Sequence, residues 1–255
     1  MERQSTSRRG PAALLIAAVL LLSLAAPAAA SAALAPERQP QEPKGPKPQL
    51  LLFHGGSFLY EDPFFEPATV QRARAAGFVP HFVSYPLDDM PAAVLSARAE
   101  ARRLREKFGP ERVYAYGSSA GGTLAALLSG DGLVAAAVAK APVSDLAGWE
   151  WPLEAYGPDY YEEIDLGPAA RYRLSPVRRP AKSPLLIYQG RGDRVVPPAM
   201  NEAFAAKFER VHLWTVPGGH TTERERPYLI GRAMQWLART ASLQARAAAR
   251  KDTVV

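Results

Sequence analysis

Short apolar runs alternate with longer helical patterns between residues 49 and 240, and this alternation predicts the fold. The apolar runs cover residues 50–54, 78–84, 112–116, 134–140, 185–189 and 211–216. Strands separated by helices form βαβ units, in which parallel strands lie side by side and both faces of the sheet are buried. The pattern therefore predicts an α/β protein with a reduced, mostly parallel sheet of about six strands, flanked by helices.

Glycine and proline positions agree with this succession of elements. Gly77, Gly109 and Gly130 each lie at or just past the end of a helical run, where many helices end in a left-handed turn. Pro198 and Pro227 stand where the last two helices are expected to begin, because the first turn of a helix accepts proline.

Residues 145–180 interrupt the alternation with a stretch that mixes prolines, acidic residues and aromatic residues. Its aromatic residues are Trp149, Trp151, Tyr156, Tyr160, Tyr161 and Tyr172. An aromatic insertion above the carboxyl edge of a parallel sheet is a candidate lid, with Trp149, Trp151 and Tyr156 as candidate substrate-binding residues. The alternative is a packing segment that covers a pair of helices.

The first 35 residues have the character of an export signal. Positive charge at Arg3, Arg8 and Arg9 precedes an uncharged run over residues 12–35 that is rich in Ala and Leu and contains small residues near its end. This order of features predicts a signal peptide, and hence a secreted or cell-envelope protein. An uncleaved membrane anchor is the alternative, since about 20 apolar residues can span a bilayer.

Two further segments flank the predicted catalytic domain, which covers residues 49–240. Residues 36–48 contain five prolines in thirteen positions and little to bury, which is typical of an extended linker. Residues 241–255 form a basic tail with Arg246, Arg250 and Lys251.

Composition removes several classes of site. The chain has no cysteine, which excludes disulfides, a thiol nucleophile and a cysteine-ligated zinc site. Its four histidines do not form a His-Glu-x-x-His motif, and no phosphate-binding or dinucleotide-binding glycine pattern is present, so we expect neither a metal nor a cofactor.

The net charge of +6 falls to +4 without residues 1–35, which hold three Arg and one Glu. The basic residues between 98 and 107 alternate with Glu100 and Glu106, which is typical of a solvated helix face rather than of a nucleic-acid surface. We therefore expect no nucleic-acid partner, while mild basicity favours association with an anionic envelope surface. No feature of the sequence specifies an oligomeric state.

The pentapeptide Gly117-Ser118-Ser119-Ala120-Gly121 lies between an apolar run and a helix-forming run. Strand, sharp turn and helix are the setting of a nucleophile elbow, which would expose the hydroxyl of Ser119 at its tip. A serine hydroxyl is a poor nucleophile near neutral pH unless a histidine base, an orienting carboxylate and oxyanion donors surround it.

Candidates for these groups follow other predicted strands. Asp193 comes directly after the run 185–189, and His220 comes directly after the run 211–216. The carboxyl ends of parallel strands share one edge of a sheet, so both side chains are expected near Ser119. Asp145 is the alternative acid.

His54-Gly55-Gly56-Ser57 follows the first strand and is the candidate oxyanion loop. Two glycines let the backbone approach a substrate closely and turn an N–H toward it. Gly56 and Ala120 are the expected donors, with Gly55 as a third candidate, while His54 is expected to shape this loop through hydrogen bonds.

These motifs together resemble the α/β-hydrolase superfamily, in particular esterases and lipases related to hormone-sensitive lipase and the prolyl oligopeptidase-type hydrolases. The matching pieces are His54-Gly55-Gly56, the run 85–93, Gly117 to Gly122, Asp193 with Val196-Pro197, and Gly219-His220. Two departures are Ser118, where the hormone-sensitive lipase group usually has Asp, and Ser57, where it often has a third Gly. The resemblance extends over residues 50–240.

The resemblance implies a Ser119, Asp193, His220 triad and a small-molecule ester substrate. The expected reaction is hydrolysis of a carboxylic ester through an acyl-enzyme intermediate. A peptidase or an acyltransferase with the same triad is the nearest alternative, since ester and amide cleavage share the tetrahedral intermediate. A non-catalytic envelope-binding protein on a hydrolase fold is an alternative of another class.

Overall fold

The computed structural model describes residues 46–62, 66–152 and 156–252. The predicted signal peptide or anchor, most of the predicted linker and the last three residues of the predicted tail lie outside this described part. Within it, no helix is long and apolar enough to cross a membrane.

Six parallel strands form one sheet in the order β2-β1-β3-β4-β5-β6. Their bounds are β1 Gln49–Phe53, β2 Val79–Phe82, β3 Val113–Ser118, β4 Ala136–Lys140, β5 Leu185–Gly190 and β6 Val211–Val216. The expected strand number and parallel arrangement are confirmed. The order reverses between β1 and β3, and a reversal of this kind leaves a crevice at the carboxyl ends of the two strands.

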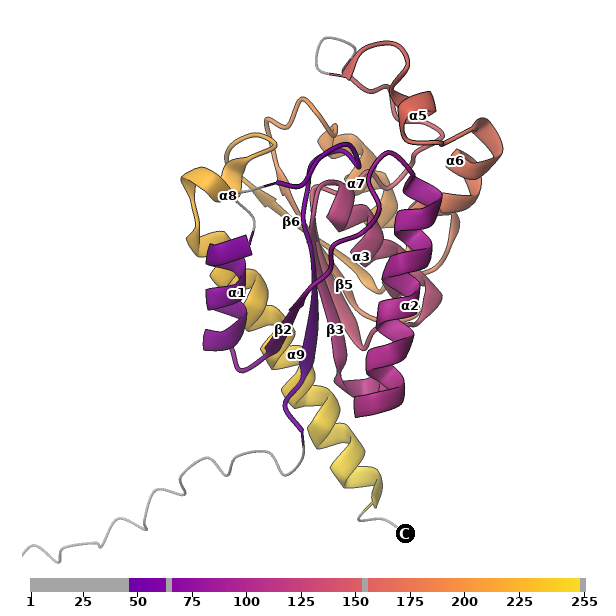
Figure 1. Cartoon of the computed structure of the whole chain (residues 1–255). Coiled ribbons are helices and arrows are strands. Elements are labelled where there is room, and N and C mark those ends of the chain that lie inside the picture. Colours follow the sequence, from indigo (N-terminus) through magenta and orange to yellow (C-terminus); the bar gives the residue numbers. More distant parts are fainter. Residues whose placement is uncertain (1–45, 63–65, 153–155, 253–255) are drawn as a thin grey trace, which may run out of the picture. The chain divides into compact units, whose positions relative to one another are not determined.

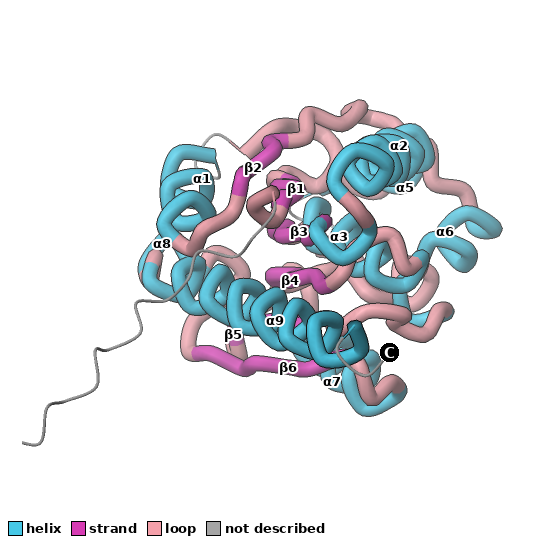
Figure 2. The backbone as a smooth tube through the Cα atoms, turned by 90° about the horizontal axis from the view of Figure 1, so that it is seen from below, coloured by secondary structure: helices cyan, strands magenta, loops and turns pink. Residues whose placement is uncertain are grey.

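Helices cover both faces of the sheet (Figures 1 and 2). One face packs against α2 (Met90–Phe108), α3 (Ala120–Asp131) and α7 (Pro198–Lys207). The other packs against α1 (Glu66–Ala75) and α9 (Tyr228–Asp252). Strand side chains alternate between the faces, and all five residues of β1 are buried. The four central strands β1, β3, β4 and β5 are buried along their whole length, whereas the edge strands β2 and β6 are partly exposed.

The glycine ending the third helix differs from the prediction. Gly130 lies inside α3, which continues to Asp131 and ends at Gly132. Gly132 has φ 72°, and its N–H bonds back to the carbonyls of Leu128 and Ser129. Only the residue in the left-handed turn needs to be glycine, and Gly132, two residues after Gly130, occupies that position.

The aromatic stretch between β4 and β5 contains the short helices α5 (Tyr160–Glu163), α6 (Pro168–Leu174) and η2 (Pro176–Arg178). Its rings pack on one another, with centroids 4.5 Å apart for Trp151 and Tyr161 and 5.7 Å apart for Trp149 and Tyr160. Most of them join the core that lies beneath α2 and α3. The stretch is thus held by side-chain packing rather than by the sheet.

The remaining helices are η1 (Pro110–Arg112), which leads into β3, and α8 (Thr222–Glu225), which follows β6. Helix α9 continues without a break through residue 240, so the described part of the predicted tail belongs to this helix. Its last turns leave the sheet, and Leu243 is exposed.

Candidate active site

Ser119 occupies a sharp turn between β3 and α3. Its φ of 54° lies in the left-handed region, which is strained for a residue with a side chain. The N–H of Ser119 donates to the carbonyl of Lys140 over 2.8 Å, and its own carbonyl accepts from the N–H of Thr123 over 3.0 Å. Backbone hydrogen bonds on both sides therefore hold the serine in the strained conformation.

The glycines of this turn are required by main-chain contacts. A Cβ at Gly117 would lie 2.0 Å from the carbonyl oxygen of Gly121, and a Cβ at Gly121 would lie 2.2 Å from that of Phe53. Both distances are far below a van der Waals contact. Glycine is therefore needed at both positions, because main-chain atoms of β1, β3 and α3 come into direct contact there.

The loop after β1 has a backbone that few residues adopt. Gly56, Ser57 and Phe58 have φ of 108°, 58° and 63°, and a Cβ at Gly56 would lie 1.8 Å from the carbonyl oxygen of Tyr60. The N–H groups of Leu59 and Tyr60 both donate to the Gly56 carbonyl, which closes the turn. Strain of this kind is common in loops that bind ligands.

His54 fixes the start of this loop. Its Nδ1 lies 2.5 Å from the carbonyl oxygen of Gly55, and Tyr85 donates to the His54 carbonyl over 2.9 Å. The two rings stack with centroids 4.2 Å apart. Burial lowers the pKa of His54, which favours a neutral ring. His54 thus shapes the loop through hydrogen bonds, as expected.

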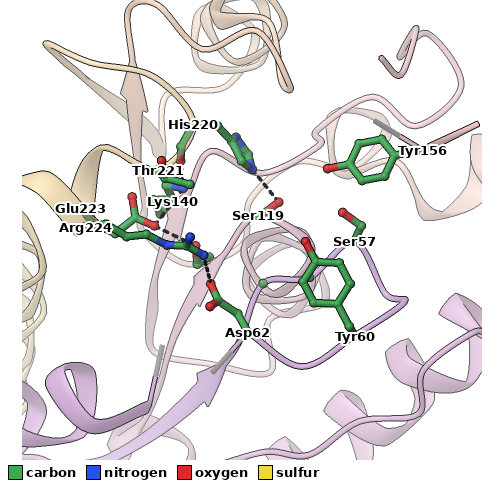
Figure 3. A pocket seen from close by; sticks show the side chains of 13 residues that line it. Ser57, Tyr60, Asp62, Ser119, Lys140, Tyr156, His220, Thr221, Glu223 and Arg224 are labelled. Carbon is green, nitrogen blue, oxygen red and sulfur yellow. Dashed lines mark hydrogen bonds and ion pairs between the residues drawn. The ribbon is translucent and has the colours of Figure 1, made fainter. Parts of the chain in front are cut away.

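His220 connects the other two candidates (Figure 3 shows its bond to Ser119). Its Nε2 lies 2.9 Å from Oγ of Ser119, and its Nδ1 lies 2.8 Å from Oδ2 of Asp193. With Nδ1–H donating to the carboxylate, Nε2 carries the lone pair that accepts the serine proton. The structure therefore brings together the three residues that the sequence placed after three separate strands.

Asp193 is buried and surrounded by donors. The N–H groups of Val195 and Val196 each donate to its Oδ1 over 2.9 Å, and Nε2 of Gln189 donates to its Oδ2 over 2.8 Å. Burial works to raise the pKa of Asp193, but the hydrogen bonds and the nearby His220 outweigh it and lower the pKa. The carboxylate therefore stays ionised beside the imidazole.

Two buried amide side chains, Gln189 and Asn201, support this carboxylate. Asn201 donates from Nδ2 to the side-chain oxygen of Gln189 over 2.7 Å and to the carbonyl of Pro142 over 3.0 Å. Neither amide side chain is exposed. Sequence reasoning missed both residues, although Gln189 ends an apolar run and a buried amide there needs partners.

The surroundings of His220 lower its pKa. Burial is the main cause and the cation of Lys140 the next, while the hydrogen bond and charge of Asp193 and the charge of Glu223 act in the opposite direction. A neutral imidazole near pH 7 is the form that can accept a proton.

Sequence reasoning also missed Lys140, at the end of β4, and Glu223, in α8. The Lys140 side chain is 2% exposed; its Nζ donates to the carbonyl of His220 and lies 3.0 Å from Oε1 of Glu223. Ser118 Oγ donates to the same carboxylate oxygen over 3.4 Å. The only feature of the sequence that could have indicated Lys140 is its position as a charged residue at the end of an apolar run. No feature of the sequence indicates a role for Glu223.

A small polar pocket of about 60 Å³ opens beside Ser119. Its lining includes Gly55, Gly56, Ser57, Tyr60, Asp62, Tyr156, Thr221 and Arg224, together with Ser118, Ser119, Lys140, His220 and Glu223. Arg224 and Asp62 form an ion pair in the pocket wall, with 3.0 Å between a guanidinium nitrogen and Oδ2. This pair lies on the side of Ser119 opposite Tyr156 (Figure 3). The pocket is therefore polar and partly charged, and Tyr60 and Tyr156 are its aromatic lining residues.

The other predicted residues lie as follows. Ala120 begins α3 directly after Ser119, and Tyr156 lines the pocket. Trp149 and Trp151 lie outside its lining. The indole N–H of Trp149 donates to the carbonyl of Val195 in the loop after β5, and that of Trp151 donates to the carbonyl of Gly157 within the aromatic stretch.

Asp145, the alternative acid, accepts a hydrogen bond from Ser175 and pairs with Arg178, whereas His220 contacts Asp193. Among the described residues, no three His, Asp or Glu side chains are grouped so that they could hold a metal ion.

The sequence model of the prolyl oligopeptidase family matches residues 92–243, which is more than half of the chain. This chain belongs to the prolyl oligopeptidase family. The expected membership of the α/β-hydrolase superfamily is thereby confirmed, and the protein is a serine hydrolase of that class. The family match contains Ser119, Asp193 and His220, whereas the loop after β1 precedes it.

Solved structures of other hydrolases share the fold of this prolyl oligopeptidase family member. The thermophilic esterase Est2 of the Planctomycetes species Thermogutta terrifontis is 21% identical, with a TM-score of 0.62 over 77% of this chain and 81% of the esterase. An acetyl ester-xyloside bifunctional hydrolase from Caldicellulosiruptor lactoaceticus is 18% identical, with a TM-score of 0.63 over 78% of this chain and 83% of that one. No curated protein sequence matches the chain.

Proposed function

We propose that this serine hydrolase cleaves carboxylic esters through an acyl-enzyme on Ser119. The hydrogen-bonded chain from Asp193 through His220 to Ser119 is the observation that carries the proposal. The small pocket beside Ser119 favours a short acyl or alkoxy group over an extended peptide. The fold relative Est2 is named as an esterase and has been solved with butyrate bound, which supports an ester substrate.

In the first half of the reaction, Ser119 Oγ attacks the ester carbonyl carbon while His220 Nε2 takes the hydroxyl proton. The tetrahedral intermediate collapses when His220 returns this proton to the alkoxy oxygen, which leaves as the alcohol. In the second half, His220 removes a proton from water, the resulting hydroxide attacks the acyl-enzyme, and Ser119 regains its proton as the acid departs. Asp193 keeps Nδ1 protonated throughout.

Backbone N–H groups of Gly56 and Ala120, with Gly55 as a third candidate, are proposed to stabilise the oxyanion. The positive φ of Gly56 gives this loop a conformation that a side chain would prevent, and Ala120 lies at the N-terminus of α3, where the helix dipole favours negative charge. Each such donor typically contributes about 10²- to 10³-fold in rate. Tyr156 is the proposed substrate contact on the opposite wall, since it lines the pocket.

The test of this proposal compares two neighbouring serines. Ser119→Ala is expected to abolish both p-nitrophenyl acetate hydrolysis and fluorophosphonate labelling, because it removes the attacking oxygen. Ser118→Ala is expected to retain labelling, since the hydroxyl of Ser118 is directed to Glu223 rather than to His220. Retention of hydrolysis by Ser119→Ala would refute the mechanism.

A peptidase activity is the second candidate, and the family match favours it. Kinetics on a panel of short-chain esters and blocked peptide amides of the same acyl group would separate the two, with an alcohol added to reveal acyl transfer. Hydrolysis of the amides at rates comparable to the esters would favour the peptidase.

A further inference from the structure

Lys140 is bonded to both the nucleophile and the base of the site. Its main-chain carbonyl accepts the N–H of Ser119, and its Nζ donates to the main-chain carbonyl of His220. It is the last residue of β4, a strand buried along its whole length. One residue therefore links the elbow to the loop that carries the imidazole.

Glu223 completes this connection from α8. Its Oε1 lies 3.0 Å from Nζ of Lys140 and accepts the hydroxyl of Ser118, the residue that precedes the nucleophile. The side chains of Lys140 and Glu223 are 2% and 13% exposed, so solvent screens this ion pair little. Figure 3 shows Glu223 and Lys140 on the side of His220 away from Tyr156.

A buried ion pair at this position needs an explanation other than stability. Removing an ammonium and a carboxylate from water costs about as much as their attraction returns, and apolar residues of similar size are often as stabilising. The neighbouring strand residues Val138 and Ala139 show that an apolar side chain suits this sheet. The charges instead lie beside His220, whose protonation the reaction changes.

We infer that Lys140 and Glu223 are positioning residues that hold the main chain of His220 against the elbow and balance the charge around its imidazole. The inference rests on the proposed function of Ser119 and His220. The charged groups that act on the imidazole are Asp193 from the loop after β5, Lys140 from β4 and Glu223 from α8, while Arg224 and Asp62 line the same pocket as an ion pair with each other. Of the three groups that act on the imidazole, two are anions and Lys140 is the one cation.

The two members of the pair act on His220 in opposite directions. The cation of Lys140 lowers the pKa of His220, whereas the anion of Glu223 raises it. Removing the cation should therefore move the His220 titration to higher pH, and removing the anion should move it to lower pH. A purely structural role predicts no such difference in sign between the two variants.

The experiment measures the titration of the His220 imidazole by NMR in Lys140→Met, Glu223→Gln and wild type, with the signal assigned by its loss in His220→Asn. Shifts of opposite sign support the inference, while shifts of the same sign, or none, overturn it. Matched controls are Lys207→Met and Glu225→Gln, which remove the same charges from exposed positions that do not line the pocket. If Lys140→Met does not fold, the direction in Glu223→Gln decides, because only a shift to lower pH agrees with the inference.

Kinetics supply a second readout. The acid limb of kcat/KM for p-nitrophenyl acetate should follow the NMR midpoints, and the plateau of Lys140→Met should fall about tenfold to a hundredfold because the base is displaced. Lys140→Arg, which retains the charge, should restore the position of the acid limb. If wild type hydrolyses no ester, the proposed function fails, while the NMR titration still decides the inference about Lys140 and Glu223.

Discussion

The elbow around Ser119 and the support of Asp193 serve the same site but are built differently. In the elbow, main-chain atoms of β1, β3 and α3 meet directly, so that a single added carbon would lie 2.0 to 2.2 Å from a carbonyl oxygen. The acid arm, by which we mean Asn201, Gln189 and Asp193, is a chain of side-chain hydrogen bonds 2.7 to 2.8 Å long.

Because of this difference, the two regions should respond differently to amino-acid substitutions. A backbone contact cannot relax without moving a strand, whereas a side-chain hydrogen bond can lengthen, turn or accept water. The elbow glycines Gly117 and Gly121 should therefore tolerate almost no substitution. In the acid arm, a substitution should impair catalysis more the closer it lies to His220.

The largest effect is expected for Gly121→Ala. The new methyl group would overlap the carbonyl oxygens of Phe53 and His54, which belong to another strand and its loop. We expect the free energy of unfolding to fall by about 3 kcal/mol or more, measured by urea denaturation, together with loss of activity.

Gly130→Ala is the matched control in the same helix. A Cβ there would lie at ordinary contact distances, 3.5 Å from the Arg179 side chain. The alanine restricts the backbone of the unfolded chain, so this substitution should stabilise the protein by up to about 1 kcal/mol. Equal destabilisation by the two variants would remove the steric account of the elbow.

Asp193→Asn should have the next largest effect, this time on catalysis. In this variant the N–H groups of Val195 and Val196 would hold the amide oxygen, so the amide NH2 would face Nδ1 of His220. An N–H there favours the tautomer that carries its proton on Nε2, which cannot accept the proton of Ser119. We expect kcat to fall by about 10³ to 10⁴ in steady-state kinetics. Asp145→Asn is the control, and a comparable loss there would indicate that Asp145 is the acid.

Gln189→Leu tests the second link of the acid arm. It removes one donor to Asp193 and one acceptor for Asn201, both buried. A hydrogen bond to a charged group contributes about 1.5 to 3 kcal/mol, so we expect a loss of this order in stability and about a tenfold loss in kcat/KM. Unchanged kinetics would show that the two Val N–H groups suffice to hold the carboxylate.

The smallest effect is expected for Trp149→Phe. Trp149 reaches the acid arm only through its bond to the carbonyl of Val195, whose N–H donates to Asp193. Loss of this one bond should cost about 1 kcal/mol in stability and change kcat/KM less than about threefold. A strong rise in KM for aromatic esters would instead indicate that Trp149 contacts the substrate.

The elbow was the more predictable of the two regions from sequence. Gly117 to Gly121 between an apolar run and a helical run is a local pattern, because neighbouring residues generate the strained turn. The acid arm combines Gln189 with Asn201, which lies in the following helix, and nothing in the intervening sequence marks their contact. The same holds for Glu223, whose partner Lys140 lies 83 positions earlier in the chain.

The aromatic stretch shows the limit of composition as a guide. Its aromatic residues pointed equally to a substrate surface and to packing, since a large ring serves both. The structure places Tyr156 at the pocket and leaves the two indoles outside its lining, with their N–H groups bonded to the carbonyls of Val195 and Gly157. Burial depends on neighbours that are remote in sequence, so it could not be read from the residue types.

The sequence by itself determined the six strands, their parallel direction and the three residues that meet at their carboxyl ends, because hydrophobic period and turn chemistry are local properties. Only the tertiary structure decided what surrounds His220. The charges of Lys140 and Glu223 act over a few ångströms of space, and the chain brings them there from β4 and α8. Electrostatic interactions depend on distance and burial, and the fold sets both.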